Sequence, residues 1–429
     1  MCFAGTGMKV CLVTNLYEPY STGGADIYVK WIAEALRDRG HEVFVVTTCP
    51  PRDSFLRIKK EKIAGVPVYR FYPLNIYWGY LAQRKPLILK PFWHTVELLN
   101  PHVYLAFKRI LNKEKPNIVH INNMGGFSNA IFWASRGNGR KLIYTLHDYL
   151  SICPKSVLLR NNFDRCSGPR FLCQIYQMIK RWNLKNTIDV CIAPSHFVLE
   201  MHRKYRLFGN DNSVVLRHGV EISDAGMEKA AKKREKYQKN KSVNVLYMGR
   251  VDVHKGLPVL TDAIKNTNRG DLNLHIAGSG DYLDQMRREL KHYNNVTFHG
   301  WVTGAYKENL FCQCDVSVLP SICYEVAGLV ILESYKYGLP VIGSRIGGIP
   351  EIVQEKRTGF LFEPGNAAEL ASILGSISKT QLNPMRKHCR TAAMEFTMEK
   401  HLEKMVALYK HLMSGGSPGS KVSASLETG

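Results

Sequence analysis

Two glutamates and a glycine in the segment CYEVAGLVILES (residues 323–334) have the spacing to hold a sugar nucleotide from end to end. Gly328 stands where we expect a helix to begin, and the N–H groups of a first helical turn lack backbone acceptors, so they can bind a phosphate. Glu325 and Glu333 are eight residues apart, or roughly 12 Å if all eight were helical. One carboxylate can therefore accept hydroxyl hydrogen bonds near the helix start and the other further along. This span fits a diphosphate flanked by two sugars.

The same pair also fits two glutamates on a solvated helix face, so the surrounding pattern decides. Residues 339–344 (LPVIGS) are predicted to form a short buried strand, Gly347 and Gly348 open a loop, and a new helix is predicted around 349–354. Such alternation is typical of α/β proteins. Further strands are predicted at residues 118–121, 141–145, 190–193, 243–250, 272–277, 296–300 and 316–319.

The N-terminal part opens with the same alternation. A strand is predicted at 8–14 and a second at 41–48, with an amphipathic helix at about 25–39 between them. Gly23 and Gly24 lie between the first strand and the helix, which is where parallel sheets bind ligands. The loop has no G-x-G-x-x-G pattern, and this disfavours a nicotinamide enzyme.

Length and composition bound the class of protein. A chain of 429 residues with 45% hydrophobic content can bury a large core and is expected to form two domains. The sequence contains no run of about 18 apolar residues, so no membrane-spanning helix is predicted. The opening MCFAGTG does not resemble a secretory signal. The eleven cysteines are scattered through predicted strands and helices, as is typical of reduced core thiols. We therefore expect a soluble cytoplasmic enzyme.

The positive charge is concentrated in the N-terminal half. Residues 1–220 carry 31 Lys and Arg against 14 Asp and Glu, whereas residues 221–429 carry 27 against 22. Such a field attracts phosphates, nucleic acid or anionic lipid, although a merely solvated basic surface also explains it. Aromatic residues alternate with cations over residues 69–93. This mixture predicts contact with a membrane interface, and core aromatics with a solvated face are the alternative.

Six motifs in order resemble the glycosyltransferases of the GT-B fold, and family 4 in particular. The resemblance covers nearly the whole chain and implies an α/β fold of two Rossmann-like domains facing across a cleft. It implies an enzyme that transfers a sugar from a nucleotide diphosphate sugar. The motifs are PYSTGGAD (19–26), TLHDYLSICP (145–154), MGRVDVHKG (248–256), IAGSGD (276–281), FHGWV (298–302) and EVAGLVILES (325–334).

The resemblance assigns roles in the second half of the chain. Arg250 and Lys255 resemble the cationic pair that grips the donor diphosphate and stabilises it as it leaves, although loop cations on a solvated rim would look alike. Glu325 would contact the donor sugar and Glu333 the nucleotide ribose. Backbone groups at two further places would complete the donor site: Gly328, Leu329 and Val330 at the phosphates, and Gly278 and Gly280 below the base.

In the first half, the resemblance places His147 at a strand end facing the cleft, in contact with the transferred sugar. Gly23 and Gly24 would approach the donor phosphates or the acceptor, since glycine has no Cβ. Asp26 stands where the family often has glutamate. Family members retain the anomeric configuration. No Asp-x-Asp motif, the metal anchor of the other large transferase fold, occurs here, so we expect transfer without a metal or other cofactor.

Three cysteines, Cys153, Cys166 and Cys173, lie within 21 positions, but they lack both a close C-x2-C pair and a fourth ligand at standard spacing. We favour a reduced structural cluster over a metal site. The expected domains are an acceptor-binding domain at 1–220, a linker at 221–242, a nucleotide-sugar-binding domain at 243–395, a helix at 396–413 that packs back on the first domain, and a disordered tail at 414–429.

These observations favour a retaining hexosyltransferase with a lipid-linked or phosphate-bearing glycan as acceptor, located in the cytoplasm and at the inner face of the membrane. A nucleotide-sugar epimerase of the same fold is the alternative, but epimerisation needs acid and base groups around the sugar, and Arg250, Lys255 and Glu325 fit transfer better. Nucleic-acid binding is disfavoured because no RNA-binding aromatic motif or helix-turn-helix pattern is present. The base, sugar and acceptor stay open.

Overall fold

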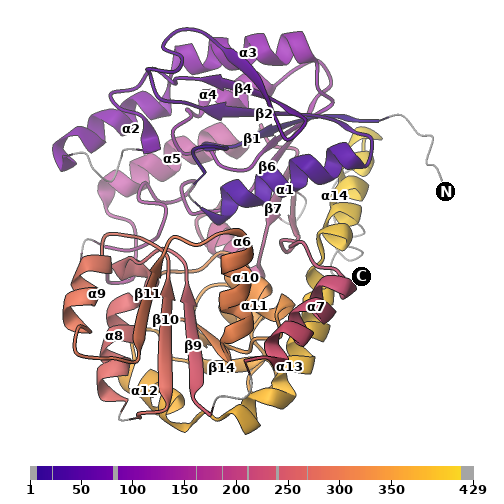
Figure 1. The fold of residues 1–429 in the computed structure, drawn as a ribbon. Helices are drawn as coiled ribbons and strands as arrows, with labels where there is room; N and C mark the ends of the chain where they lie inside the picture. The colour runs from indigo at the N-terminus through magenta and orange to yellow at the C-terminus, as the bar shows by residue number, and fades with distance from the viewer. Residues whose placement is uncertain are drawn as a thin grey trace. The chain divides into compact units, whose positions relative to one another are not determined.

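The computed structural model describes residues 7–21, 23–80, 86–160, 162–185, 187–209, 212–237, 241–267 and 269–416. The chain forms two compact units (Figure 1). Unit 1 comprises residues 1–157, 168–217 and 401–429, and unit 2 comprises residues 158–167 and 218–400. The tail predicted at 414–429 lies outside the described residues from 417 onward.

Unit 1 is built on an eight-stranded sheet in the order β3-β4-β2-β1-β5-β6-β7-β8, in which only the pairing of β3 with β4 is antiparallel. The strands are β1 Lys9–Val13, β2 Glu42–Thr48, β3 Lys59–Ile63, β4 Val66–Phe71, β5 Ile118–Ile121, β6 Lys141–Thr145, β7 Val190–Ala193 and β8 Ser213–Val215. The helices are α1 Gly24–Asp38, η2 Leu87–Leu89, α2 Lys90–Leu98, α3 Pro101–Glu114, α4 Ala130–Ser135, α5 Phe171–Lys185 and α6 His196–Lys204.

Unit 2 is built on a six-stranded parallel sheet in the order β11-β10-β9-β12-β13-β14, the strand order of a Rossmann sheet. Its strands are β9 Val243–Met248, β10 Leu272–Ala277, β11 Val296–Gly300, β12 Val316–Leu319, β13 Val341–Ser344 and β14 Gly359–Phe362. Its helices are α7 Asp224–Glu235, η4 Val253–Lys255, α8 Leu257–Asn266, α9 Leu283–Glu289, α10 Gly304–Gln313, α11 Leu329–Lys336, η5 Ile349–Glu351, α12 Ala367–Ser376, α13 Lys379–Ala393 and η6 Met394–Phe396.

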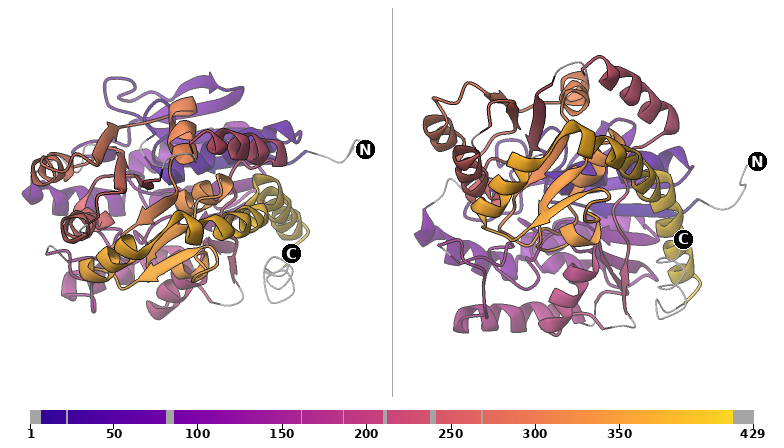
Figure 2. Two further views of the ribbon diagram at one scale, coloured as in Figure 1. Left: turned by 60° about the horizontal axis from the view of Figure 1, so that its bottom comes forward. Right: turned by 90° about the horizontal axis from the view of Figure 1, so that it is seen from below.

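Both faces of the sheet in unit 2 are covered by helices (Figure 2). Val245 and Tyr247 of β9 pack with residues of α8, α9 and α12, whereas Leu246 between them packs with Leu310 and Phe311 of α10. The alternation follows from the period of two residues in a strand. The strand is apolar on both faces because a parallel sheet is buried on both sides.

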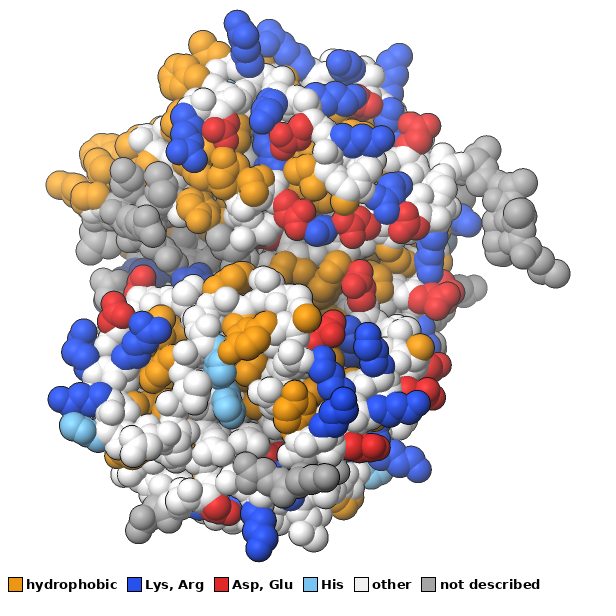
Figure 3. All heavy atoms as spheres, viewed as in Figure 1, with side chains coloured by type: hydrophobic (Ala, Val, Ile, Leu, Met, Phe, Trp, Pro, Cys, Tyr) orange, Lys and Arg blue, Asp and Glu red, His pale blue; other side chains and the backbone are white. Residues whose placement is uncertain are grey.

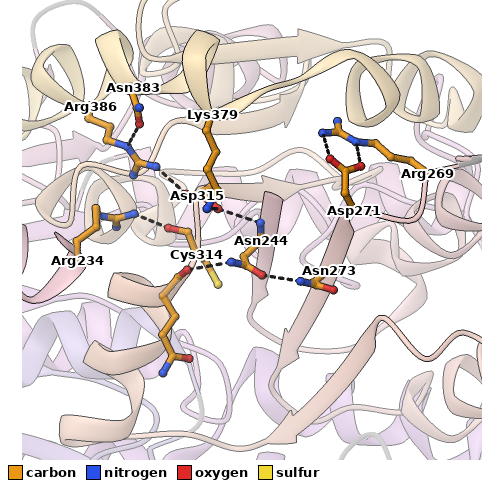
Figure 4. A network of polar contacts seen from close by, with 11 residues as sticks. Arg234, Asn244, Arg269, Asp271, Asn273, Cys314, Asp315, Lys379, Asn383 and Arg386 are labelled. Atoms are coloured by element: carbon orange, nitrogen blue, oxygen red, sulfur yellow. Dashed lines mark hydrogen bonds and ion pairs between the residues drawn. The ribbon is translucent and has the colours of Figure 1, made fainter. Parts of the chain in front are cut away.

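A buried polar network fastens the amino-terminal ends of β9 and β12 to the helices around them (Figure 4). Asp315, immediately before β12, accepts from Arg386 of α13 at 2.9 Å and from the backbone N–H of Asn244 at 3.0 Å. Arg234 of α7 donates to the carbonyl of Phe311 at 2.7 Å and to that of Tyr337 at 2.9 Å. The segment predicted as a linker at 221–242 therefore contains a helix that is anchored in unit 2.

The aromatic and basic segment at 69–93 forms part of the core of unit 1, contrary to the surface predicted for it. Its members with less than a tenth of their surface exposed are Tyr69, Arg70, Phe71, Tyr72, Tyr77, Trp78 and Trp93. The guanidinium of Arg70 can be buried because it pairs with the carboxylate of Glu61. Tyr80 and Phe92 are exposed, while Arg84 and Lys85 lie outside the described residues.

Helix α14, Met398–Met413, belongs to unit 1 from His401 onward, as predicted for the C-terminal helix. The buried Tyr409 hydroxyl lies 2.6 Å from Nδ1 of His120 on β5. His401 Nδ1 lies 2.7 Å from the carbonyl of Arg217, so it must donate, and its Nε2 then accepts from the Tyr28 hydroxyl at 2.7 Å. Two buried polar contacts thus fasten the helix to the sheet and to α1.

We predict that Tyr409→Ala destabilises unit 1 by about 3–5 kcal/mol, because it removes a fully buried aromatic ring. Tyr409→Phe should cost less, about 1–3 kcal/mol, since it removes only the hydroxyl, which contacts His120 and the sulfur of Met405. Urea unfolding measures both. Met413→Ala on the same helix, at a side chain 44% exposed, is the control and should change the free energy of unfolding little. Equal stability of Tyr409→Ala and the control would contradict this anchoring.

Candidate functional site

The sheet of unit 2 reverses its strand order between β9 and β12. From β9 the chain proceeds to β10 and β11 on one side, and then returns to β12 on the other. The loops that leave the carboxyl ends of β9 and β12 therefore diverge, and in open parallel sheets ligands bind in the crevice formed there. Arg250 and Lys255 follow β9, and Glu325 follows β12.

Lys255 and Glu325 form an ion pair between these two loops. Lys255 Nζ lies 2.7 Å from Glu325 Oε1, with 26% and 11% of the side chains exposed. Ser321 Oγ donates to the same carboxylate oxygen at 2.5 Å. Burial alone would raise the pKa of Glu325, but Lys255 outweighs it and holds the pKa below its usual range; reciprocally, Glu325 raises the pKa of Lys255 against the effect of burial. Both groups are therefore charged at neutral pH.

Arg250 is paired within its own loop and is open to solvent. Its Nη2 lies 2.5 Å from Asp252 Oδ2, and 41% of its side chain is exposed. Asp252 also accepts from the backbone N–H of Asp281 at 3.0 Å, in the loop after β10. Gly278 in that loop permits the close approach, since a Cβ there would lie 1.8 Å from the carbonyl oxygen of Gly249. Together with the Lys255–Glu325 pair, these contacts join the loops that follow β9, β10 and β12 at the carboxyl edge of the sheet.

Helix α11 begins beside Glu325 and carries Glu333 on its second turn. Gly328 caps the helix with a left-handed backbone (φ +56°), a conformation that favours glycine. The N–H groups of Leu329 and Val330 lie in the first turn, where the helix itself offers no acceptor. Glu333 Oε1 lies 2.5 Å from Lys307 Nζ of α10. Only Glu333 is helical, so the 12 Å spacing expected for eight helical residues does not apply.

In unit 1, the predicted residues follow β1 and β6. Gly23 caps α1 and donates its backbone N–H to Asp26 at 3.3 Å, while Gly24 is the first helical residue. Asp26 is buried and has a local capping role. A Cβ on Gly23 would meet no atom within 4 Å, so this backbone is open.

His147 lies just beyond β6 in a cluster of imidazoles. Its Nε2 is 3.2 Å from Asn122 Oδ1, and its ring meets that of Tyr28 edge-on with centroids 5.0 Å apart. Burial, followed by the proximity of His401, lowers the pKa of His147 to about 3. Burial also lowers the pKa of His120 to about 3. Both imidazoles are neutral at neutral pH. His120 is fully buried between Tyr409 and Thr145, so only the partly exposed His147 can exchange hydrogen bonds with a ligand, and it offers no positive charge.

The three cysteines considered for a metal site are reduced thiols. Cys153 and Cys173 belong to unit 1 and Cys166 to unit 2. Within the described part of the chain, no group of three or more His, Cys, Asp or Glu side chains is arranged to hold a metal ion.

The structure therefore gathers the residues expected in the second half of the chain into one site of unit 2, and it places His147, Gly23 and Gly24 in unit 1. Sequence reasoning missed the partners of these residues: Ser321 for Glu325, Asp252 for Arg250, and Lys307 for Glu333. Each pair is separated in sequence or lies in a loop. A motif match identifies one residue of such a pair but does not show which residue it contacts.

Comparison with known families identifies the family of the chain. Residues 22–224 match the model of Glycosyltransferase Family 4, and residues 229–396 match that of Glycosyl transferases group 1. The two matches together span most of the chain and contain every site residue predicted from the sequence. The chain belongs to these glycosyltransferases.

Curated relatives of this glycosyltransferase span most of its length. An uncharacterised protein of the cps region of Klebsiella pneumoniae is 28% identical over 80% of this chain and 87% of its own. An uncharacterised glycosyltransferase of Methanocaldococcus jannaschii is 27% identical over 85% and 87%. The phosphatidyl-myo-inositol mannosyltransferase of Mycobacterium leprae is 24% identical, again over 85% and 87%.

Solved structures show the same fold. Anabaena HepE, crystallised with UDP and glucose, has a TM-score of 0.68 and 19% identity over 94% of this chain and 99% of that one. The sucrose-phosphate synthase of Thermosynechococcus elongatus has a TM-score of 0.72 and 22% identity over 95% and 100%. The glycosyltransferase thus has two Rossmann-like domains of the GT-B type, as predicted.

We predict that Lys255→Met destabilises unit 2 by about 3 kcal/mol at pH 7, because it leaves the buried Glu325 carboxylate without its cation. The pKa of Glu325 is depressed in the folded state, so its contribution to stability is present above roughly pH 4.3 and is lost as the pH falls through the folded pKa. The difference between wild type and variant should therefore shrink as the pH falls below 4.3 in urea unfolding experiments.

The matched control is the double variant Lys255→Met/Glu325→Gln, which removes both charges and should recover most of the lost stability. A difference that persists unchanged at low pH, or a double variant no more stable than the single one, would show that the ion pair does not stabilise the loops.

Proposed function

We propose that this glycosyltransferase moves a hexosyl group from a nucleotide diphosphate sugar to a lipid-linked or phosphate-bearing glycan, with retention of configuration and without a metal. The observation that carries the proposal is the site at the carboxyl edge of β9 and β12, where two cations, two carboxylates and the start of α11 meet. Cations and N–H donors bind the oxygens of a diphosphate, and carboxylates accept hydrogen bonds from sugar hydroxyls.

Arg250 and Lys255 are assigned to the leaving diphosphate. Negative charge develops on the leaving phosphate oxygen as the glycosidic bond breaks, and fixed cations stabilise it without reorganising. The first turn of α11 at Leu329 and Val330 adds N–H donors and the positive end of the helix dipole. Together these residues would perform the task that a metal performs in other transferases.

Glu325 is assigned to the hydroxyls of the donor sugar and Glu333 to the ribose. Glu325 is already oriented by Lys255 and Ser321, so little freedom is lost when it accepts from a hydroxyl. Lys307 similarly holds Glu333. The loop containing Gly278 and Gly280 is assigned to the base.

In unit 1, we assign His147 to the transferred sugar and Gly23 and Gly24 to the phosphates or the acceptor. The neutral imidazole of His147 suits hydrogen bonding to a hydroxyl. In the proposed reaction the acceptor hydroxyl attacks from the face that the diphosphate leaves, and its proton passes to the leaving phosphate oxygen. This course gives retention and requires no protein nucleophile.

Two observations support the donor and acceptor classes. HepE was crystallised with UDP and with UDP-glucose, so a uridine nucleotide is the first donor to test. The mycobacterial relative is named for a phosphatidyl-myo-inositol substrate, and residues 1–220 of this chain carry a strong positive excess. A phosphate-bearing acceptor at the cytoplasmic face of a membrane fits both.

The test is thermal unfolding with uridine, guanosine and adenosine diphosphate sugars, with and without a chelator. A ligand that binds only the folded state stabilises it by about 2.7 kcal/mol at a hundred times its Kd, so one base should raise the melting temperature, and the chelator should not abolish the shift. Product analysis follows with phosphate-bearing glycans. Isomerised nucleotide sugar in the absence of acceptor would indicate an epimerase instead.

We predict that Glu333→Ala weakens binding of the active nucleotide sugar by about 10–100-fold, because a charged hydrogen-bond acceptor for the ribose is lost. The melting-temperature shift measures the change. Glu308→Ala, at an exposed carboxylate on α10, is the control and should bind normally. Normal donor binding by Glu333→Ala would sink the ribose assignment.

A further inference from the structure

Helix α5 has its polar side buried and its apolar side exposed, the reverse of an ordinary surface helix. Its buried side chains include Tyr176, Gln177, Lys180 and Asn183. Its apolar face, defined as Phe171, Leu172, Ile175, Met178 and Trp182, is exposed by 73%, 76%, 36%, 62% and 73% respectively. Phe171, Ile175, Met178 and Trp182 follow the i, i+4, i+7, i+11 spacing of one helix stripe.

Hydrogen bonds from the buried side fix this orientation. Lys180 Nζ donates to Asn129 Oδ1 at 2.8 Å, the Tyr176 hydroxyl to the carbonyl of Leu150 at 2.6 Å, and Gln177 Nε2 to the carbonyl of Ile152 at 2.7 Å. Rolling the helix to bury its apolar face would break all three contacts and carry the ammonium group outward. The exposure of the apolar face is therefore built into the fold of unit 1.

A second exposed apolar group lies on the neighbouring helix. Ile88 of η2 is 74% exposed and Phe92 of α2 is 62% exposed. The rings of His94 on α2 and Tyr176 on α5 lie 6.5 Å apart, so the two helices are neighbours. Hydrophobic side chains gather over the position of α2 in the space-filling view (Figure 3).

The charges beside these apolar groups have one sign. Residues 168–188, which contain α5, include four cations, of which Lys180 is buried, and no Asp or Glu. Residues 74–96 contain no Asp or Glu either, and the carboxylate of Glu97 on α2 is buried. Arg170 and Lys185 lie exposed at the two ends of α5, and Arg181 adjoins Trp182. A protein–protein interface has a polar rim with no required sign of charge. Apolar side chains flanked by cations alone are typical of a helix lying on an anionic bilayer.

We propose that α5 is the membrane-docking surface of this protein and lies flat in the interface of an anionic phospholipid bilayer. Its apolar face enters the boundary between headgroups and acyl chains, and the exposed Arg170 and Lys185 meet lipid phosphates. The contact is interfacial, because α5 has 15 residues and a membrane-spanning helix needs roughly 20. Among the described residues, no helix meets the length and hydropathy of a membrane span. The docking itself stands on α5; its use to reach a lipid-linked acceptor rests on the proposed function.

The test is flotation of the full chain with phosphatidylcholine vesicles, with and without phosphatidylglycerol. The wild type should float with the anionic vesicles. Leu172→Ser/Met178→Ser/Trp182→Ser should reduce the bound fraction at least about tenfold, since burial of apolar area drives such binding. Phe55→Ser/Leu56→Ser/Leu105→Ser is the control, because it removes three side chains of unit 1 exposed by 58%, 65% and 54%, and it should bind as the wild type does.

Depth is measured by quenching of tryptophan fluorescence with lipids brominated on their acyl chains. Quenching should be lost in Trp182→Phe, which keeps the apolar face. A wild type that floats with neither vesicle, equal binding by the two triple variants, or quenching unchanged in Trp182→Phe would overturn the proposal. A wild type that sediments as a dimer, with an α5 triple variant that sediments as a monomer, would also overturn it, since the face would then bind a second copy.

Donor binding is measured separately, by the melting shift without vesicles. The α5 triple variant should show the wild-type shift, which also demonstrates that it folds. A protein that docks on vesicles but binds no nucleotide sugar would contradict the proposed transfer reaction and leave the docking surface standing.

Discussion

The site of unit 2 depends on the divergence of the chain at the ends of β9 and β12, and the Lys255–Glu325 ion pair joins the two branches. Lys255 ends the short helix η4 and Glu325 stands on a loop, so the strands of the sheet position neither residue directly. Close packing does so instead: a Cβ on Gly256 would lie 1.6 Å from the carbonyl oxygen of Pro320, and one on Gly347 would lie 2.3 Å from that of Glu325. The loops are therefore in contact through their backbones, and the ion pair fixes the positions of the Lys255 and Glu325 side chains.

In unit 1, helix α5 buries a charged side chain and exposes apolar ones. Lys180 is buried against Asn129, and the apolar residues of α5 face outward. A buried ammonium group is costly unless it is hydrogen-bonded. This fold retains the buried ammonium group and exposes Leu172 and Trp182. It therefore lacks the hydrophobic stabilisation that a surface helix usually gains by burying its apolar face. Such an arrangement is stable in water only because the rest of unit 1 has a large core. It leaves apolar surface available for contact with a bilayer.

Apolar runs predicted most strands closely, because strands of a parallel sheet are buried on both faces and need no partner to be recognised. The helix predicted around 349–354 is only the short turn η5. Motifs named Arg250, Lys255 and Glu325, but their pairings join residues up to 70 positions apart and depend on loop packing. The exposed face of α5 escaped notice because helical periodicity is the same whichever face is buried. Residues 69–78 were misassigned because the sequence does not show that Glu61 neutralises Arg70.

The pairing of each cation with a carboxylate bears on how the proposed reaction is accelerated. Interactions that are equally strong in the bound donor and in the transition state do not raise the rate of the chemical step. With Glu325 beside Lys255 and Asp252 beside Arg250, much of the positive charge is already balanced before any donor binds. A bound diphosphate would then be held only moderately. As the glycosidic bond breaks, negative charge gathers on the leaving oxygen, and an ammonium group shared between that oxygen and Glu325 can shift toward the oxygen. In the proposed reaction, the carboxylates would thereby direct the electrostatic stabilisation toward the transition state.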